Sequence, residues 1–222
     1  GRTLRFLYDG PYENFKALIY KLGTTPLPDH ILAVRKVEDE DEERYQTVFA
    51  RNEGAVMAPT AGLHFSRALL KRMEIKGIES AFLTMHCGLG NVREIDVEDL
   101  TKHRVDSEEL HIPEETTLIV NKAIDEKKKV CAVGTSVLKG LESSVSFGGK
   151  LKPFDGWTNK FIFPPYEFTI PNCLISNFHA PLSSLFMSVC AFGGYDLIMK
   201  AYQEAIDKKY RFLTFGDAML IL

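Results

Sequence analysis

Three histidines, His64, His86 and His179, stand at or directly after small polar turns that end apolar, extended runs of the chain. An imidazole ionises close to neutral pH, so a histidine at such a turn can accept or donate a proton during catalysis. Two of them also have a simpler interpretation, in which His64 fills a gap in a turn and His86 packs on its strand. The histidines alone leave both interpretations open.

Small, hydroxyl and amide residues accompany these histidines. Gly62 permits a sharp turn or the close approach of a ligand, and Gly88 and Gly90 follow a strand, where open α/β sheets hold ligands. Thr135 and Ser136 stand at the start of a helix, where free backbone amides favour an anion or a hydroxyl. The candidates for substrate binding are Thr60, Gly62, Gly88, Gly90, Thr135, Ser136 and Asn177.

Strands and helices must position these turns. Apolar periodicity predicts helices over residues 12–22, 66–76, 114–129, 183–192 and 195–208, with a further helix that follows the Gly134 turn and runs through Ser143. Extended apolar runs predict strands over residues 4–8, 46–57, 78–85, 130–133, 161–163 and 173–175. The repeated order of strand, polar turn and helix predicts an α/β fold, with a large mixed sheet flanked by helices.

Composition places the chain among globular proteins. Its 222 residues are 45% hydrophobic and 26% charged, with a formal net charge of -3, which argues against a broadly basic nucleic-acid-binding coat. No apolar run approaches the ~20 residues that span a bilayer, and no secretory leader opens the chain, so we expect a cytoplasmic protein without a membrane partner. The four cysteines are widely spaced, which favours reduced, buried thiols over disulfides or a zinc site.

Seven segments match one known family in order. They are YQTVFA, APTAGLHF, LTMHCGLG, AVGTS with LES, FIFPPYEF, SNFHAP and YRFLTFGDAM. On these motifs the chain resembles the S-adenosylmethionine:tRNA ribosyltransferase-isomerases of queuosine biosynthesis, from about Leu4 to its carboxyl end. The segments APTAGLHF and YRFLTFGDAM are the most distinctive.

The resemblance implies a reaction and its partners. Family members transfer the ribosyl part of S-adenosylmethionine to 7-aminomethyl-7-deazaguanine at the tRNA wobble position and rearrange it to an epoxycyclopentanediol, while adenine and methionine leave. The implied partners are tRNA and S-adenosylmethionine, the latter as substrate, with no metal and no separate cofactor, and we expect a monomer. The implied fold is a mixed α/β domain with an inserted β-barrel, so that residues 1–44 would hold the end of the barrel domain and a linker, and residues 45–222 the main catalytic domain.

The implied chemistry needs a base that removes a proton beside the sulfonium and an acid that helps adenine to leave. The resemblance points to His64, His86, His179, Glu142 and Asp217 as the catalytic candidates. Thr135 and Ser136 would hold ribose or carboxylate oxygens.

Several positions differ from the family pattern. Lys139-Gly140 stands where the family carries an arginine, whose bidentate fork a lysine cannot reproduce. Asp106 replaces a histidine, Leu182 replaces a lysine, and residues 90–92 replace a GTF-type turn. The family also begins with a further segment that includes most of the β-barrel, so we expect the barrel to be mostly missing from this chain, which would be a C-terminal portion or a divergent member. The alternative function is a non-catalytic fragment or paralogue that binds an adenosyl compound or RNA.

Overall fold

The computed structural model describes residues 5–222, apart from the side chains of residues 91 and 92. The chain divides into two compact units, residues 1–45 and residues 46–222. None of the helices in the described part is long and apolar enough to cross a membrane. The assignment of residues 1–44 to the end of a barrel domain and of residues 45–222 to a catalytic domain stays a prediction.

The first unit contains three helices over its described residues, α1 (Tyr12–Leu22), α2 (Asp29–Leu32) and α3 (Asp41–Arg44). Its best-formed polar contact is at Asp41, whose buried carboxylate accepts two hydrogen bonds from Arg35, at 2.6 and 2.7 Å. The strand predicted over residues 4–8 is wrong for residues 5–8, which are irregular, and residue 4 lies outside the described residues.

One sheet of the second unit is antiparallel, in the order β1 (Thr84–His86), β2 (Glu108–Ile112) and β4 (Phe154–Thr158). Buried and exposed residues alternate along β2, as expected for a strand with one face on the core. Glu108, Leu110 and Ile112 are the buried residues of this strand. A carboxylate therefore lies beside two core residues.

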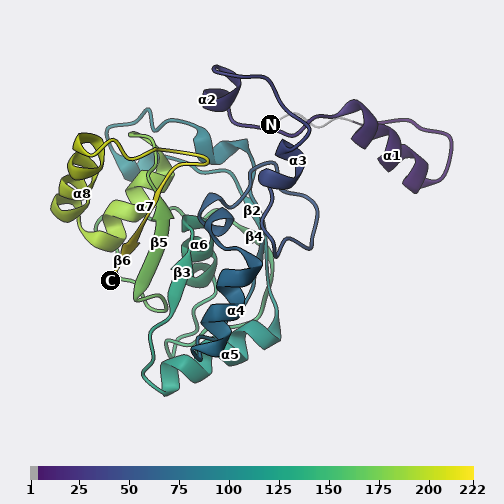
Figure 1. The fold of residues 1–222 in the computed structure, drawn as a ribbon. Helices are drawn as coiled ribbons and strands as arrows, with labels where there is room; N and C mark the ends of the chain where they lie inside the picture. The colour runs from purple at the N-terminus through teal and green to yellow at the C-terminus, as the bar shows by residue number, and fades with distance from the viewer. Residues whose placement is uncertain (1–4) are drawn as a thin grey trace. The chain divides into compact units, whose positions relative to one another are not determined.

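The other sheet is mixed, in the order β3 (Cys131–Val133), β5 (Cys173–Asn177) and β6 (Ala218–Ile221), with β5 in the centre. β3 and β5 are parallel, and β6 runs antiparallel to β5 with Ala218 opposite Asn177 (Figure 1). The carboxyl ends of β3 and β5 and the start of β6 therefore share one edge of the sheet.

Five α-helices and three short 3-10 helices complete the second unit. They are η1 (Thr60–His64), α4 (Arg67–Ile75), η2 (Leu89–Val92), η3 (Leu100–Lys102), α5 (Glu114–Asp125), α6 (Thr135–Ser143), α7 (Ser184–Gly193) and α8 (Tyr195–Asp207). α6 packs against strands of both sheets, and α7 packs against α6 and α8. The core lies between these layers and includes Leu138, Leu174 and Val189.

A glycine allows α6 to approach the antiparallel sheet closely. A Cβ atom at Gly140 would lie 3.1 Å from the Leu83 side chain and 3.3 Å from that of Leu110. Contacts of that length are tighter than ordinary packing, so a larger residue here would push the helix from the sheet. Within the Lys139-Gly140 pair, the glycine therefore allows α6 to lie close to the sheet.

The predicted mixed α/β class is confirmed, with one difference in the sheet. Two three-stranded sheets replace the single large sheet that the sequence predicted. The strands predicted over residues 46–57 and 161–163 are wrong, because both stretches are irregular and bury single side chains instead of pairing. The strands at β2, β4 and β6 were not predicted, and the predicted helices are confirmed to within a few residues at their ends.

Candidate active site

The shared edge of the mixed sheet gathers six of the twelve predicted site residues. Thr135 and Ser136 follow β3, Asn177 ends β5, and His179 lies two residues beyond it. Asp217 directly precedes β6, and η1, which ends at His64, packs against β5. We call this set the strand-end cluster: His64, Thr135, Ser136, Asn177, His179 and Asp217.

The turn that carries Asp217 is held in place by Asn177. The Asn177 side chain is 2% exposed, and its Nδ2 donates hydrogen bonds to the carbonyl oxygens of Leu213 at 3.2 Å and of Gly216 at 3.3 Å. Its Oδ1 is buried without a hydrogen-bond partner among the described residues. The amide nitrogen therefore positions the turn, and the amide oxygen remains as an acceptor.

Asp217 is an ionised carboxylate close to His64. It accepts a hydrogen bond from the backbone amide of Arg211 at 2.7 Å and one from the Arg211 guanidinium at 3.3 Å. The amide hydrogen bond holds the pKa of Asp217 below its ordinary value, against the opposing effect of burial, and the charges of Arg211 and His64 lower it further. The negative charge at this edge therefore lies near the exposed imidazole of His64.

His179 is held at both its backbone and its ring. Its amide donates to the Tyr202 hydroxyl at 2.9 Å, and its Nε2 lies 2.9 Å from the Ser176 hydroxyl. Burial lowers the pKa of His179 to about 4, because desolvation disfavours the charged ring. At neutral pH this imidazole is uncharged and can accept a proton.

η1 brings His64 beside the turn after β3. A Cβ atom built on Gly134 would lie 3.7 Å from the methyl group of Ala61, so the two turns are neighbours. Gly134 has a φ of 95°, in the region that favours glycine. Thr60 begins η1 and is half-buried at this position.

Gly62 is needed for packing. The sequence alone could not tell this role from contact with a ligand. A Cβ atom there would lie 2.9 Å from the side chains of both Phe49 and Thr47. The glycine is therefore required because residues of the preceding irregular stretch press against it.

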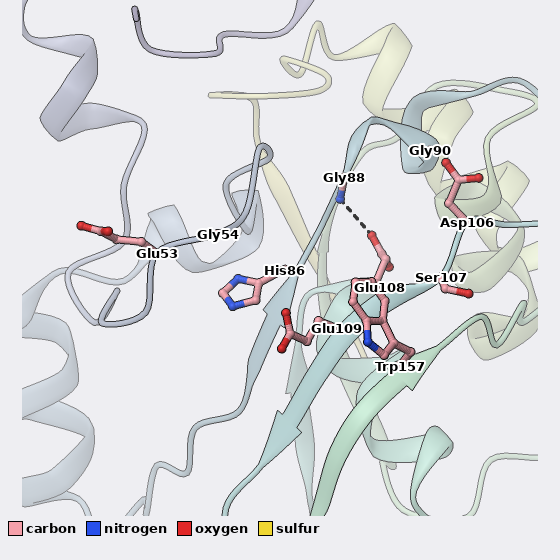
Figure 2. A pocket seen from close by; sticks show the side chains of 10 residues that line it. All are labelled: Glu53, Gly54, His86, Gly88, Gly90, Asp106, Ser107, Glu108, Glu109 and Trp157. Atoms are coloured by element: carbon pink, nitrogen blue, oxygen red, sulfur yellow. Dashed lines mark hydrogen bonds between the residues drawn. The ribbon is translucent and has the colours of Figure 1, made fainter. Parts of the chain in front are cut away.

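Three further predicted residues, His86, Gly88 and Gly90, line a separate cavity of about 360 Å³ beside the antiparallel sheet (Figure 2). Its carboxylates come from Glu53, Asp106, Glu108 and Glu109, and Ser107, Trp157 and Gly54 complete the lining. We call it the carboxylate cavity. The His86 ring projects between the segment that carries Gly54 and the Glu109 side chain (Figure 2).

Glu108 and Asp106 have cationic partners. Lys139 forms an ion pair with Glu108 at 2.8 Å, with both side chains nearly buried, and Arg93 contacts Asp106 at 3.3 Å near the surface. Glu109 has no ion-pair partner among the described residues. The Gly88 amide donates to Glu108 at 3.2 Å, which fixes the turn after β1. The cavity therefore offers Glu109 and His86 to a cationic ligand.

Glu142 lies in neither group. It is buried on α6, where one carboxylate oxygen accepts hydrogen bonds from the amides of Thr169 and Ile170, both at 3.0 Å, and the other accepts one from the Tyr166 hydroxyl at 3.1 Å. The negative charge of Glu142 and burial raise the pKa of Tyr166, burial having the larger effect. This geometry supports a structural role for Glu142.

Sequence reasoning missed several residues that shape these sites. Ser176 and Tyr202 hold His179, Arg211 holds Asp217, and Trp157 walls the carboxylate cavity. The spacing of Ser176 and His179 across the turn was a usable signal, because a serine three residues before a histidine can reach its ring. Arg211 and Trp157 reach their sites through loop and strand pairings that no local pattern marks.

Comparisons with known proteins extend over the whole chain. The family described as queuosine biosynthesis protein matches residues 1–221. An S-adenosylmethionine:tRNA ribosyltransferase-isomerase from Bacteroides fragilis is 64% identical over all 222 residues, and one from Phocaeicola vulgatus is 63% identical. In each case the chain spans 63% of the length of the relative.

A solved structure agrees with the fold. The crystal structure of an S-adenosylmethionine tRNA ribosyltransferase from Thermotoga maritima matches with a TM-score of 0.60 and 35% sequence identity, over 73% of this chain and 51% of that protein. Family, relatives and structure point the same way, and the chain belongs to the queuosine biosynthesis protein family.

Proposed function

We propose that the protein is a tRNA-modifying enzyme that transfers the ribosyl part of S-adenosylmethionine to 7-aminomethyl-7-deazaguanine in tRNA and isomerises it. The relatives from Bacteroides fragilis and Phocaeicola vulgatus carry the name of this activity. The observation that carries the proposal is the strand-end cluster, which combines a neutral, half-buried imidazole with an imidazole close enough to a carboxylate to lower the pKa of that carboxylate. That pairing suits a reaction with one proton removed and one donated.

The neutral imidazole is assigned the basic role. We propose that His179 removes the proton beside the sulfonium, because a ring that is uncharged at neutral pH has a free lone pair. His64 then acts as the acid that assists the departure of adenine, with the charge of Asp217 beside it. Thr135 and Ser136, with Thr60, bind ribose or carboxylate oxygens at the start of α6.

The carboxylate cavity is assigned to the base that receives the ribosyl group. The aminomethyl group of that base is a primary amine, and Glu109 and His86 offer it a negative charge and a proton acceptor. Trp157 is 67% exposed and offers an aromatic face on which a base can stack. Gly88 leaves the cavity wall open to a planar ligand, because nothing lies within 4 Å of the place of its Cβ, whereas Gly90 packs against the Asp106 carboxylate.

The proposed partners follow from the reaction. They are tRNA and S-adenosylmethionine, which is consumed as a substrate rather than held as a cofactor, and the reaction as proposed uses no metal. Because tRNA is its substrate, we propose that the protein works in the cytoplasm, as a monomer.

Adenine release tests the proposal. S-adenosylmethionine is incubated with tRNA that carries 7-aminomethyl-7-deazaguanine, using this chain alone and this chain joined to the portion of the Bacteroides fragilis relative that it does not match. Adenine release by the longer protein, with ribosyl transfer to tRNA, is the expected result. Binding of S-adenosylmethionine or tRNA without adenine release would support the non-catalytic alternative and contradict the enzyme.

A further inference from the structure

A buried serine contacts the ring of His179 and has two neighbours that compete for its single proton. Ser176 is 0% exposed. Its Oγ lies 3.1 Å from the carbonyl oxygen of Asn177 and 2.9 Å from Nε2 of His179. A carbonyl oxygen can only accept a hydrogen bond, whereas a neutral imidazole nitrogen donates or accepts according to its tautomer.

These contacts select one tautomer of the ring. A serine hydroxyl has one hydrogen, and Ser176 donates it to the carbonyl of Asn177. The Oγ then offers only lone pairs to the histidine, so Nε2 must carry the ring hydrogen and donate it. Nδ1 is consequently the nitrogen with the free lone pair.

Nδ1 is also open to a reactant. No hydrogen bond to this atom occurs among residues 5–222, and His179 is half-buried rather than fully buried. The titratable group that contacts His179 from the packed helix α8 is Tyr202, through the backbone amide rather than the ring. His64 and Asp217 lie at the same edge, outside hydrogen-bond contact with the ring.

We propose that Ser176 is a positioning residue that fixes His179 in its Nε2-protonated form and so makes Nδ1 the proton acceptor of the reaction. The acceptor role rests on the proposed function, whereas the tautomer does not. In the step, the carbon–hydrogen bond beside the sulfonium breaks, its electron pair stays on carbon, and the proton forms an N–H bond at Nδ1. The resulting imidazolium still donates from Nε2 to Ser176, and it returns the Nδ1 proton to solvent later in the cycle.

Nitrogen NMR of the histidine-labelled chain tests the tautomer without any activity assay. The chain has six histidines, and the signals of His179 are identified by their loss in His179→Gln. The expected result at neutral pH is a protonated Nε2 and an unprotonated Nδ1 in the unmodified chain. A protonated Nδ1 would overturn the proposal. This measurement needs no variant of Ser176, so it tests the tautomer even if Ser176→Ala does not fold.

Substitution of Ser176 tests the positioning role. Ser176→Ala is expected to populate both tautomers of His179, while Ser188→Ala, which also removes a hydroxyl bonded to backbone carbonyls, leaves the tautomer unchanged. In the longer protein, adenine release by Ser176→Ala should fall in kcat with little change in KM, by about twofold for an even mixture and by more as the wrong tautomer dominates, because only the enzyme with a free Nδ1 reacts. An unchanged tautomer in Ser176→Ala would overturn the role of Ser176.

Failure of the proposed function and failure of the tautomer assignment give different results. If the longer protein releases no adenine while Nε2 is protonated, the proposed function and the acceptor role fail together, and the tautomer assignment stands. If adenine is released normally while Nδ1 is protonated, the function stands and this inference fails.

Discussion

The hydrogen-bond partners of a carboxylate decide whether it can take part in chemistry. The predicted catalytic candidates Glu142 and Asp217 both accept backbone amides, yet only Asp217 lies in the strand-end cluster. Both oxygens of Glu142 are occupied by the segment that contains Tyr166 and Ile170. The motifs point to both residues, but the hydrogen bonds of Glu142 fasten a loop, whereas Asp217 lies in the cluster that we propose as the site.

Replacing Glu142 should therefore lower stability. In Glu142→Gln the remaining carbonyl oxygen can still accept from the amides of Thr169 and Ile170, but an NH2 group replaces the charged oxygen that accepted from Tyr166, so that hydroxyl loses its acceptor. We expect a loss of about 1–3 kcal/mol in the free energy of unfolding, measured by urea denaturation. Glu167→Gln, on an exposed residue of the same segment, is the control and should change little. Equal stability of the two variants would contradict the structural role.

Gly62 provides a second test at the scale of one residue. Gly62→Ala places a methyl group 2.9 Å from the side chains of Phe49 and Thr47, which must move. Overpacking of this kind costs about 1–3 kcal/mol, to be measured by thermal unfolding. Gly148→Ala is the control, because nothing lies within 4 Å of the added methyl group. A Gly62→Ala protein as stable as the control would show that the packing at η1 is looser than described.

At the scale of elements, helices were predicted well because their signals are local. α4 begins after Ser66, whose Oγ accepts a hydrogen bond from the Leu69 amide at 3.1 Å, and the sequence placed a helix there from its apolar spacing. α7 begins in the same way after Ser183, which accepts from the Phe186 amide at 3.1 Å. Caps and periodicity lie within one element and can be read without the rest of the fold.

The cap of α4 should be measurable. Ser66→Ala removes the acceptor for the Leu69 amide and is expected to lower the free energy of unfolding by about 1 kcal/mol. Ser66→Asp keeps an acceptor at the same place and should retain most of the stability. Amide hydrogen exchange should become faster in the first turn of α4 in Ser66→Ala but not in Ser66→Asp, which would place the loss of stability at the cap. Equal exchange rates in the two variants would contradict a capping role for Ser66.

Strands were predicted poorly because their pairing is distant. β4 contains Asp155 and Gly156, which disfavour strands, yet it pairs with β2 along its whole length. β2 begins with Glu108, which resembles a surface residue until Lys139 neutralises it in the interior. Conversely, residues 161–163 have strand-like composition but end at Pro164 and bury only Ile162. For β2 and β4, residues that lie far along the chain therefore decide whether a strand forms.

For the molecule as a whole, protonation of His179 links the site to stability. The pKa of its ring is lowered by burial from an ordinary value of 6.5 to about 4. The folded protein therefore binds fewer protons than the unfolded chain between these values, so stability is fully present above pH 6.5 and is lost as the pH falls through about 4. Burial of the neutral ring thus favours folding only at neutral and higher pH.

We expect His179→Gln to be less sensitive to acid. Urea denaturation at pH 7 and pH 5 should show a smaller decrease in the free energy of unfolding for this variant than for the unmodified chain. His111→Gln, on an exposed histidine of β2, is the control and should behave like the unmodified chain. Identical pH dependence for all three proteins would mean that His179 ionises as freely when folded as when unfolded.

The sequence treated as one site a set of residues that the fold divides between two places. It marked His64, His179 and Asp217 through their motifs, and the mixed sheet brings them to one edge. It could not separate them from His86, because strand-and-turn patterns look alike whichever sheet they belong to. The division into a strand-end cluster and a carboxylate cavity depends on the two sheets, and their strand pairing follows from contacts across the whole unit.

The central claim is that the strand-end cluster performs the chemistry, and adenine release by His64→Ala tests it most directly. The variant is compared in the longer protein with His111→Ala, whose histidine lies on β2 and belongs to neither group. We predict that kcat falls by about a hundredfold or more in His64→Ala and stays unchanged in His111→Ala, as expected for loss of an acid catalyst. Normal adenine release by His64→Ala would contradict the account.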